Sequence, residues 1–210
     1  MDKKTYETFY EEFGPVLKEG VYTDTSKQKK LAGLARYKTT RSDNKWISLD
    51  DYVGNMKPDQ KEIFYITGEN LTSLLNSPHL EKLKEKDYEV LLMTDPVDEW
   101  VVQSLTEYDG KPVKSAEKGD LELDAVDDNK KEEFNALFGF IKSHLEDQVK
   151  EVKPSTRLKG SVSCLSSESH EMSAYMEKNS EGQWSKRTGR QTGAGIEYGT
   201  PGIVENQISF

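Results

Sequence analysis

The sequence predicts an α/β fold, with a helical coil over residues 1–60 and a small three-layer αβα sandwich over residues 61–146. Two short apolar runs, Ile63–Thr67 and Glu89–Met93, are typical of strands buried on both faces. Segments with helical periodicity follow each run, and strands that alternate with helices favour a parallel sheet with right-handed crossovers. Alternating polar and apolar residues after residue 147 predict half-buried strands, the start of a second, α+β domain.

Three helices are expected in the coil. The first is expected to stop at Gly14–Pro15, because a proline inside a helix removes a backbone hydrogen bond. The second follows Asp24–Thr25. The third begins at Ser48, which can cap it while Asp51 reaches back to the Ser48 backbone. An aromatic stripe at helical spacing marks the first helix and consists of Tyr6, Phe9, Tyr10 and Phe13.

Two cap-and-proline signals mark the helices of the sandwich. Ser77–Pro78 opens the helix between the first two strands, and Asp95–Pro96 opens a helix that is expected to reach about Thr106. The inner face of this last helix is predicted to consist of Val97, Val101 and Leu105. Lys111–Ser115 is predicted to be a third, edge-like strand, and a further helix is expected over residues 130–147.

A second domain is expected over residues 147–178. Within it, Gln148–Val152 and Ser161–Ser166 alternate like half-buried antiparallel strands. Residues 179–210 form a glycine-rich tail in which neither helical nor strand periodicity persists. A native segment, a shifted reading frame and an added cloning segment all stay open as the origin of this tail.

The composition excludes several classes of protein. A net charge of −9 argues against nucleic acid as a partner, because the phosphate backbone attracts basic surfaces. No apolar run approaches the length of a membrane span, so no membrane partner is expected. Cys164 is the chain's single cysteine and cannot form an internal disulfide, which favours a cytoplasmic protein.

No set of residues predicts a catalytic, cofactor or metal site. The three histidines, His79, His144 and His170, are far apart and lack cysteine or carboxylate neighbours at metal-ligand spacing. The turn at Thr67–Asn70 lacks the glycines that let a backbone approach a pyrophosphate. Asp124–Asn129 lacks the glycine and the final glutamate of a calcium loop. We therefore expect no catalysis by this chain alone.

Two features are candidates for contact with other proteins. Trp100 is predicted to lie on the flank of its helix, one turn from polar Gln103, as a partly exposed contact anchor. The alternative is that Trp100 covers a neighbouring element. An apolar stripe at helical spacing is formed by Met172, Tyr175 and Met176, and methionine-rich faces adapt to many partners. Ordinary core packing is the alternative for this stripe.

Several long motifs occur in one order along the chain. They are Tyr6–Phe13, Leu31–Tyr37, Ile47–Gly68, Ser77–Leu83, Glu89–Gly110, and Arg157–Leu158 followed by Met172–Glu177. Together they resemble the ninety-kilodalton heat shock protein family, the HtpG-type ATP-dependent chaperones of the stress response. The resemblance extends from about residue 5 to residue 178 and favours the bacterial branch.

The resemblance implies a role in protein folding. Residues 5–60 are similar to the helical coil of the family's middle domain, residues 61–146 to its small αβα subdomain, and residues from 147 to the start of its C-terminal dimerisation domain. The chain would be the client-binding and lever portion of a cytoplasmic, homodimeric chaperone. ATP, magnesium and the family's catalytic arginine would belong to segments before Met1, so this fragment is not expected to be an enzyme.

The same resemblance implies where non-native client proteins bind. The expected client-binding residues are Trp100, Gln103, Met172, Tyr175 and Met176. The alternative function is a nucleotide- or metabolite-binding enzyme built on the αβα sandwich, and a third possibility is a structural spacer without client affinity.

Overall fold

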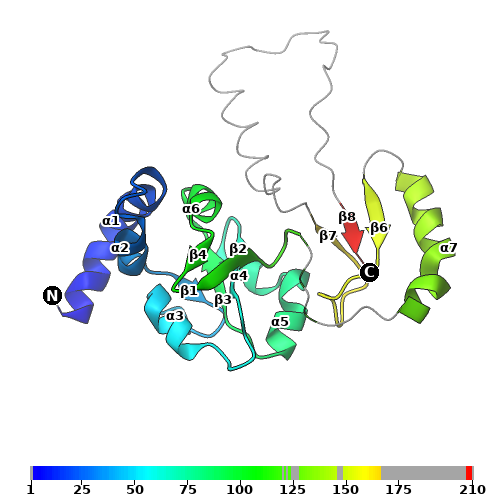
Figure 1. The fold of residues 1–210 in the computed structure, drawn as a ribbon, viewed down its shortest axis with the longest axis horizontal. Coiled ribbons are helices and arrows are strands. Elements are labelled where there is room, and N and C mark those ends of the chain that lie inside the picture. The colour runs from blue at the N-terminus through cyan, green and yellow to red at the C-terminus, as the bar shows by residue number, and fades with distance from the viewer. Residues whose placement is uncertain are drawn as a thin grey trace, which may run out of the picture. The chain divides into compact units, whose positions relative to one another are not determined.

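The computed structural model describes residues 2–119, 121, 123, 128–145, 149–166 and 207–209. The chain divides into two compact units, Met1–Ala116 and Glu117–Phe210 (Figure 1). The elements of the first unit are α1 (Lys3–Thr23), α2 (Gln28–Leu34), β1 (Lys38–Thr39), α3 (Leu49–Asn55), β2 (Ile63–Thr67), α4 (Leu71–Leu75), η1 (Pro78–Leu80), α5 (Glu81–Glu85), β3 (Val90–Met93), α6 (Asp98–Ser104), β4 (Glu107–Tyr108) and β5 (Lys111–Ser115).

The first unit contains a five-stranded mixed sheet in the order β1-β3-β2-β5-β4. Its three central strands are parallel, as predicted, and β1 and β4 pair antiparallel to them at the two edges. The prediction that Lys111–Ser115 forms an edge strand is wrong, because β4 covers its outer side. A tight turn joins β4 to β5, and both Asp109 and Gly110 adopt positive φ there (49° and 73°), as a two-residue hairpin turn requires.

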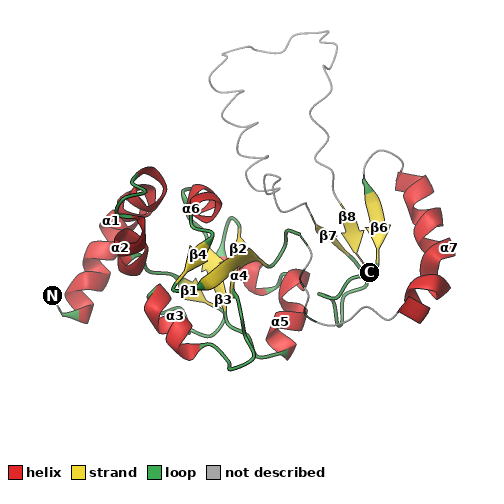
Figure 2. Ribbon diagram, in the orientation of Figure 1, coloured by secondary structure: helices red, strands yellow, loops and turns green. Residues whose placement is uncertain are grey.

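Helices cover both faces of this sheet. Alternate residues of a strand face opposite sides, and one set (Ile63, Tyr65, Leu91 and Met93) is buried in one core with residues of α1, α2, α3 and α6. On the other face the Phe64 ring stacks on Tyr88 at 6.0 Å, and α4 contacts β3. In Figure 2 the strands of the sheet lie between α6 and α5. The predicted three-layer arrangement is therefore confirmed.

Helix α1 continues through Pro15, so the prediction that it stops at Gly14–Pro15 is wrong. A proline removes one helical hydrogen bond, but packing of the following turns offsets this loss. Lys18 and Val21 are buried in the second half of the helix, and α1 contacts both α2 and α6. Tertiary contacts thus extend the helix past a residue that usually ends one.

The helix caps were predicted with mixed success. Ser48 and Asp51 form the expected reciprocal cap of α3, with hydrogen bonds of 3.0 and 3.1 Å. The prediction that Asp95 caps α6 is wrong, because the helix begins at Asp98 and ends at Ser104, short of Thr106. The Asp98 carboxylate instead accepts a hydrogen bond from the Asp95 backbone N–H at 3.1 Å.

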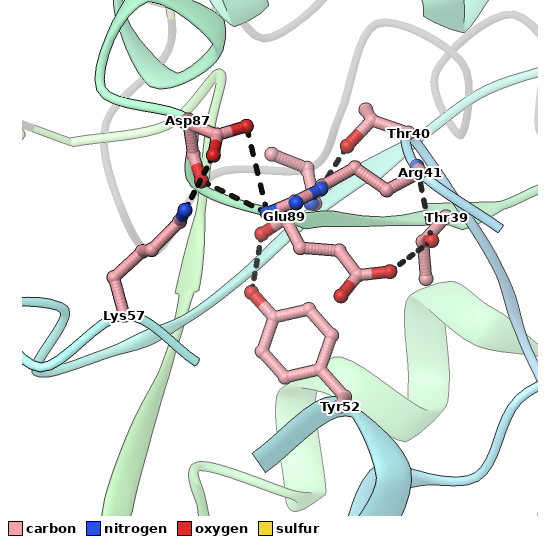
Figure 3. A network of polar contacts seen from close by, with 8 residues as sticks. Thr39, Thr40, Arg41, Tyr52, Lys57, Asp87 and Glu89 are labelled. Carbon is pink, nitrogen blue, oxygen red and sulfur yellow. Dashed lines mark hydrogen bonds and ion pairs between the residues drawn. The ribbon is translucent and has the colours of Figure 1, made fainter. Parts of the chain in front are cut away.

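A polar cluster at the amino end of β3 links segments that are far apart in the sequence (Figure 3). The Tyr52 hydroxyl donates to the Glu89 carbonyl oxygen, and the Thr39 hydroxyl donates to the Glu89 carboxylate. Asp87 forms an ion pair of 2.5 Å with Lys57, whose hydrogen bond lowers the pKa of Asp87. Since these groups satisfy one another, we interpret the cluster as structural: it joins β1, α3 and β3.

The second unit contains α7 (Asp128–Leu145) and a sheet of β6 (Glu151–Lys153), β7 (Cys164–Ser166) and β8 (Gln207–Ser209). The strand order is β6-β8-β7, with β8 parallel to β6 and antiparallel to β7. The two predicted strands are confirmed only in part, because each begins three residues later than expected and β6 pairs in parallel rather than antiparallel. Cys164 is buried, as expected. The expectation that residues 179–210 hold no strand is wrong for residues 207–209.

Arg157 organises the start of this second unit. Its side chain is buried, and its two terminal nitrogens donate to the carbonyl oxygens of Glu117 and Lys118 at 3.1 and 3.2 Å. The guanidinium group suits this task because it presents several donors in one plane.

Candidate functional site at the junction of α1 and α6

Helix α6 buries one face and exposes another. Val101 is fully buried, whereas the Trp100 side chain is 42% exposed and Gln103 is exposed one turn later. The predicted position of Trp100 on the flank of the helix is therefore confirmed. The expected contact of Trp100 and Gln103 with clients stays a prediction.

A second aromatic ring lies beside Trp100. Tyr22, in the last turn of α1, is 41% exposed, and its ring centroid lies 5.6 Å from that of Trp100 at an interplanar angle of 44°. Trp100 thus covers part of a neighbouring helix and still exposes much of its own surface. Sequence reasoning missed Tyr22, because the first helix was expected to end before it.

The two rings border an open depression of about 440 Å³. From α1 the depression is lined by Glu19, Tyr22 and Thr23, and from the start of α6 by Pro96, Val97 and Trp100. The walls are therefore mostly apolar or aromatic, and Glu19 contributes a carboxylate to the lining. We call this feature the aromatic depression.

A buried ion pair joins α1 to the start of α6 close to the aromatic depression. The Lys18 ammonium lies 2.7 Å from a carboxylate oxygen of Asp95 and 2.8 and 3.0 Å from the two carboxylate oxygens of Asp98. Lys18 and Asp98 are 3% and 0% exposed, whereas the Asp95 side chain is 36% exposed. The pair thus links α1, which carries Glu19 and Tyr22, to the start of α6, which carries Trp100.

The electrostatic environment keeps this pair charged. Burial alone would lower the pKa of Lys18, but the Asp98 carboxylate, with Tyr10, Tyr37 and Asp95, raises it above its ordinary value. Burial raises the pKa of Asp98, and the Lys18 ammonium opposes that shift. Because the ammonium lies within 3.0 Å of both carboxylate oxygens, we take Lys18 and Asp98 as ionised at neutral pH.

Met172, Tyr175 and Met176 lie outside the described residues. Among the described residues, no group of three or more His, Cys, Asp or Glu side chains could hold a metal ion. No helix in the described part of the chain is long and apolar enough to cross a membrane.

Comparison with known proteins identifies relatives over most of the chain. Residues 1–195 match the family model described as Hsp90 protein. Chaperone protein HtpG of Geobacter metallireducens is 45% identical over 184 residues, and that of Paraburkholderia xenovorans is 42% identical over 186 residues. These matches cover 82% and 84% of this chain but only 28% and 29% of the relatives, so the chain spans less than a third of their length.

One solved structure agrees with these matches. The middle domain of a Plasmodium falciparum heat shock protein is 43% identical, with a TM-score of 0.51. The similarity covers 53% of this chain and 47% of that structure.

Proposed function

This chain belongs to the Hsp90 protein family, and we propose that it forms the client-binding and lever portion of an HtpG-type ATP-dependent chaperone. By lever we mean the part that transmits a closing movement of the chaperone to the bound client. Similarity to a heat shock protein middle domain supports this assignment.

The observation that supports client binding is the exposed pair of Tyr22 and Trp100. Aromatic side chains offer a large contact area at a small cost in conformational entropy, and tryptophan and tyrosine dominate the energetics of protein interfaces. Non-native proteins expose apolar side chains that such a surface can cover. We propose that Gln103 adds a polar contact one turn away, and that Met172, Tyr175 and Met176 form a second client-contact surface.

The lever role depends on a rigid connection between the helices that border the aromatic depression. The Lys18–Asp98 pair and the packing of α1 against α6 hold Trp100 and Tyr22 together. A movement applied to α1 would therefore move both rings as one body. In the proposed full-length chaperone, a cytoplasmic homodimer, ATP and magnesium bind segments outside this chain, and this chain alone neither binds nor hydrolyses ATP.

Suppression of client aggregation by the purified chain tests this proposal. We expect Trp100→Ala to weaken the affinity for a heat-unfolded client about fivefold or more, as truncation of an interface anchor does. Phe13→Ala is the matched control, because Phe13 is 52% exposed on α1 but does not line the aromatic depression. Equal suppression by the wild type and Trp100→Ala would contradict the proposal.

A thermal-shift experiment separates this function from the enzyme alternative. We expect a non-native client, and no nucleotide, to raise the melting temperature of the chain, because only a bound species stabilises the native state. Stabilisation by a nucleotide without any effect of the client would favour the enzyme. No response to either would favour a structural spacer.

A further inference from the structure

We propose that the aromatic depression binds a lysine or arginine side chain of the client, at a position flanked by apolar residues. This inference rests on the proposed client-binding function and specifies the chemical class of segment that the site selects.

The rings of the depression suit a cation. Tyr22 and Trp100 are inclined at 44° with centroids 5.6 Å apart, and each is about two-fifths exposed (41% and 42%). A lysine or arginine head within about 6 Å of an aromatic centroid is attracted by the ring quadrupole, most strongly by tryptophan. Pro96 and Val97 supply apolar walls for the methylene groups of such a side chain.

The charges around the depression also favour a basic ligand. Glu19 lines it, is exposed, and forms no ion pair with a described residue. No lysine or arginine is among the described residues that line the depression, and the adjacent Lys18 is buried and paired with two carboxylates. The lining formed by these residues therefore carries one carboxylate and no cationic side chain, a charge pattern that favours a basic ligand over an acidic one.

Two competing occupants fit less well. A wholly apolar client segment would cover the rings but leave the Glu19 carboxylate partly desolvated without a partner, which costs free energy. A second copy of this chain would bring a net charge of −9 toward an acidic site. A basic side chain within an apolar segment satisfies both the rings and the carboxylate.

Fluorescence anisotropy with labelled, unstructured peptides tests the inference. Three probes differ only at a central residue between leucines, which is lysine, norleucine or glutamate. We expect the lysine peptide to bind about 5- to 10-fold more tightly than the norleucine peptide, from one cation–π contact and one exposed ion pair, and the glutamate peptide to bind most weakly. The preference for lysine should shrink as salt is added.

Variants assign this preference to the site. Glu19→Gln should reduce the preference for lysine to about twofold, because the ion pair is lost, and should bind the norleucine peptide at least as tightly as the wild type, because an amide costs less to desolvate than a carboxylate. Glu12→Gln, on the same helix but not in the depression, should leave the preference intact. Trp100→Ala should weaken the binding of all three peptides.

The outcomes separate this inference from the proposed function. Equal binding of the lysine and norleucine peptides, both weakened by Trp100→Ala, would overturn the inference and leave the proposed function standing. Binding unaffected by Trp100→Ala would overturn both. If Glu19→Gln kept the full preference of the wild type for the lysine peptide, the role given to Glu19 in the aromatic depression would be overturned.

Discussion

Replacing Lys18 by methionine tests whether a buried ion pair anchors α6 to α1. Methionine keeps the length and the apolar stem of lysine but lacks the ammonium group. The substitution removes contacts of 2.7 Å to Asp95 and 2.8 Å to Asp98. The two carboxylates respond differently, because Asp95 is 36% exposed and can be hydrated, whereas Asp98 is fully buried.

The expected cost follows from this difference in burial. Removing one partner of a buried pair leaves an uncompensated charge and costs about 3–5 kcal/mol. The contact with the partly exposed Asp95 adds at most about 1 kcal/mol. We expect Lys18→Met to lower the free energy of unfolding of the first unit by about 3–4 kcal/mol, since methionine recovers some apolar burial. A domain of this size is stable by about 5–15 kcal/mol, so the variant should still fold.

Urea denaturation followed by circular dichroism measures this loss. Lys27→Met is the matched control, because Lys27 also pairs with an aspartate but is 67% exposed. Its expected cost is about 0.5 kcal/mol or less. The double variant Lys18→Met/Asp98→Asn should be more stable than Lys18→Met, because the neutral amide keeps an acceptor for the Asp95 N–H and removes the unpaired charge.

The result that refutes this reasoning is a small effect. If Lys18→Met cost no more than Lys27→Met, the pair would not anchor α6. If Asp98→Asn failed to restore stability in the Lys18→Met background, an unpaired buried charge would not be the cause of the loss.

Three further predictions concern local features of the first unit. Ser48→Ala should lower the free energy of unfolding by about 1 kcal/mol in the same urea assay, because it removes the hydroxyl that accepts a hydrogen bond from the Asp51 N–H at 3.0 Å. No loss of stability would mean that the cap is dispensable. Burial raises the pKa of Tyr10 from 10.0 to about 12, so its proton is held more tightly in the folded chain. Its contribution to the free energy of unfolding should be complete below about pH 10 and should fall by up to about 3 kcal/mol by pH 12. Urea titrations at stepped pH should therefore show a smaller loss of stability with pH in Tyr10→Phe than in the wild type, and an equal loss would contradict this prediction. Gly110→Ala should lower the free energy of unfolding by about 1 kcal/mol, because Gly110 has a φ of 73° in the turn between β4 and β5. An unchanged urea midpoint would show that the turn relaxes to accept alanine.

Local chemistry made much of the first unit predictable. The apolar runs that form β2 and β3 are short, continuous and bounded by turn residues, so their burial could be inferred without knowing their neighbours. The reciprocal cap of α3 was predictable because Ser48 and Asp51 are only three residues apart and need no other segment.

The predictions from sequence were wrong at places where segments far apart in the chain pack together. Pro15 lies inside α1 because α2 and α6 pack against the later turns of that helix. β5 is an interior strand because β4, only two residues long, folds back onto it. No local signal reports either contact, since both depend on which surfaces the fold brings together.

The candidate site shows the same division. The flank position of Trp100 on α6 could be predicted from periodicity alone, because the spacing of the valines assigns the inner face of the helix. The ring of Tyr22 beside Trp100 and the position of Glu19 in the same depression follow from how α1 packs against α6, which no local pattern reports. These residues lie some eighty positions earlier in the chain, and the buried Lys18–Asp98 pair that joins the two helices has a sequence separation of 80. Periodicity reports how one helix divides its own faces, whereas the neighbour of each face is set by packing of the whole sheet and its helices.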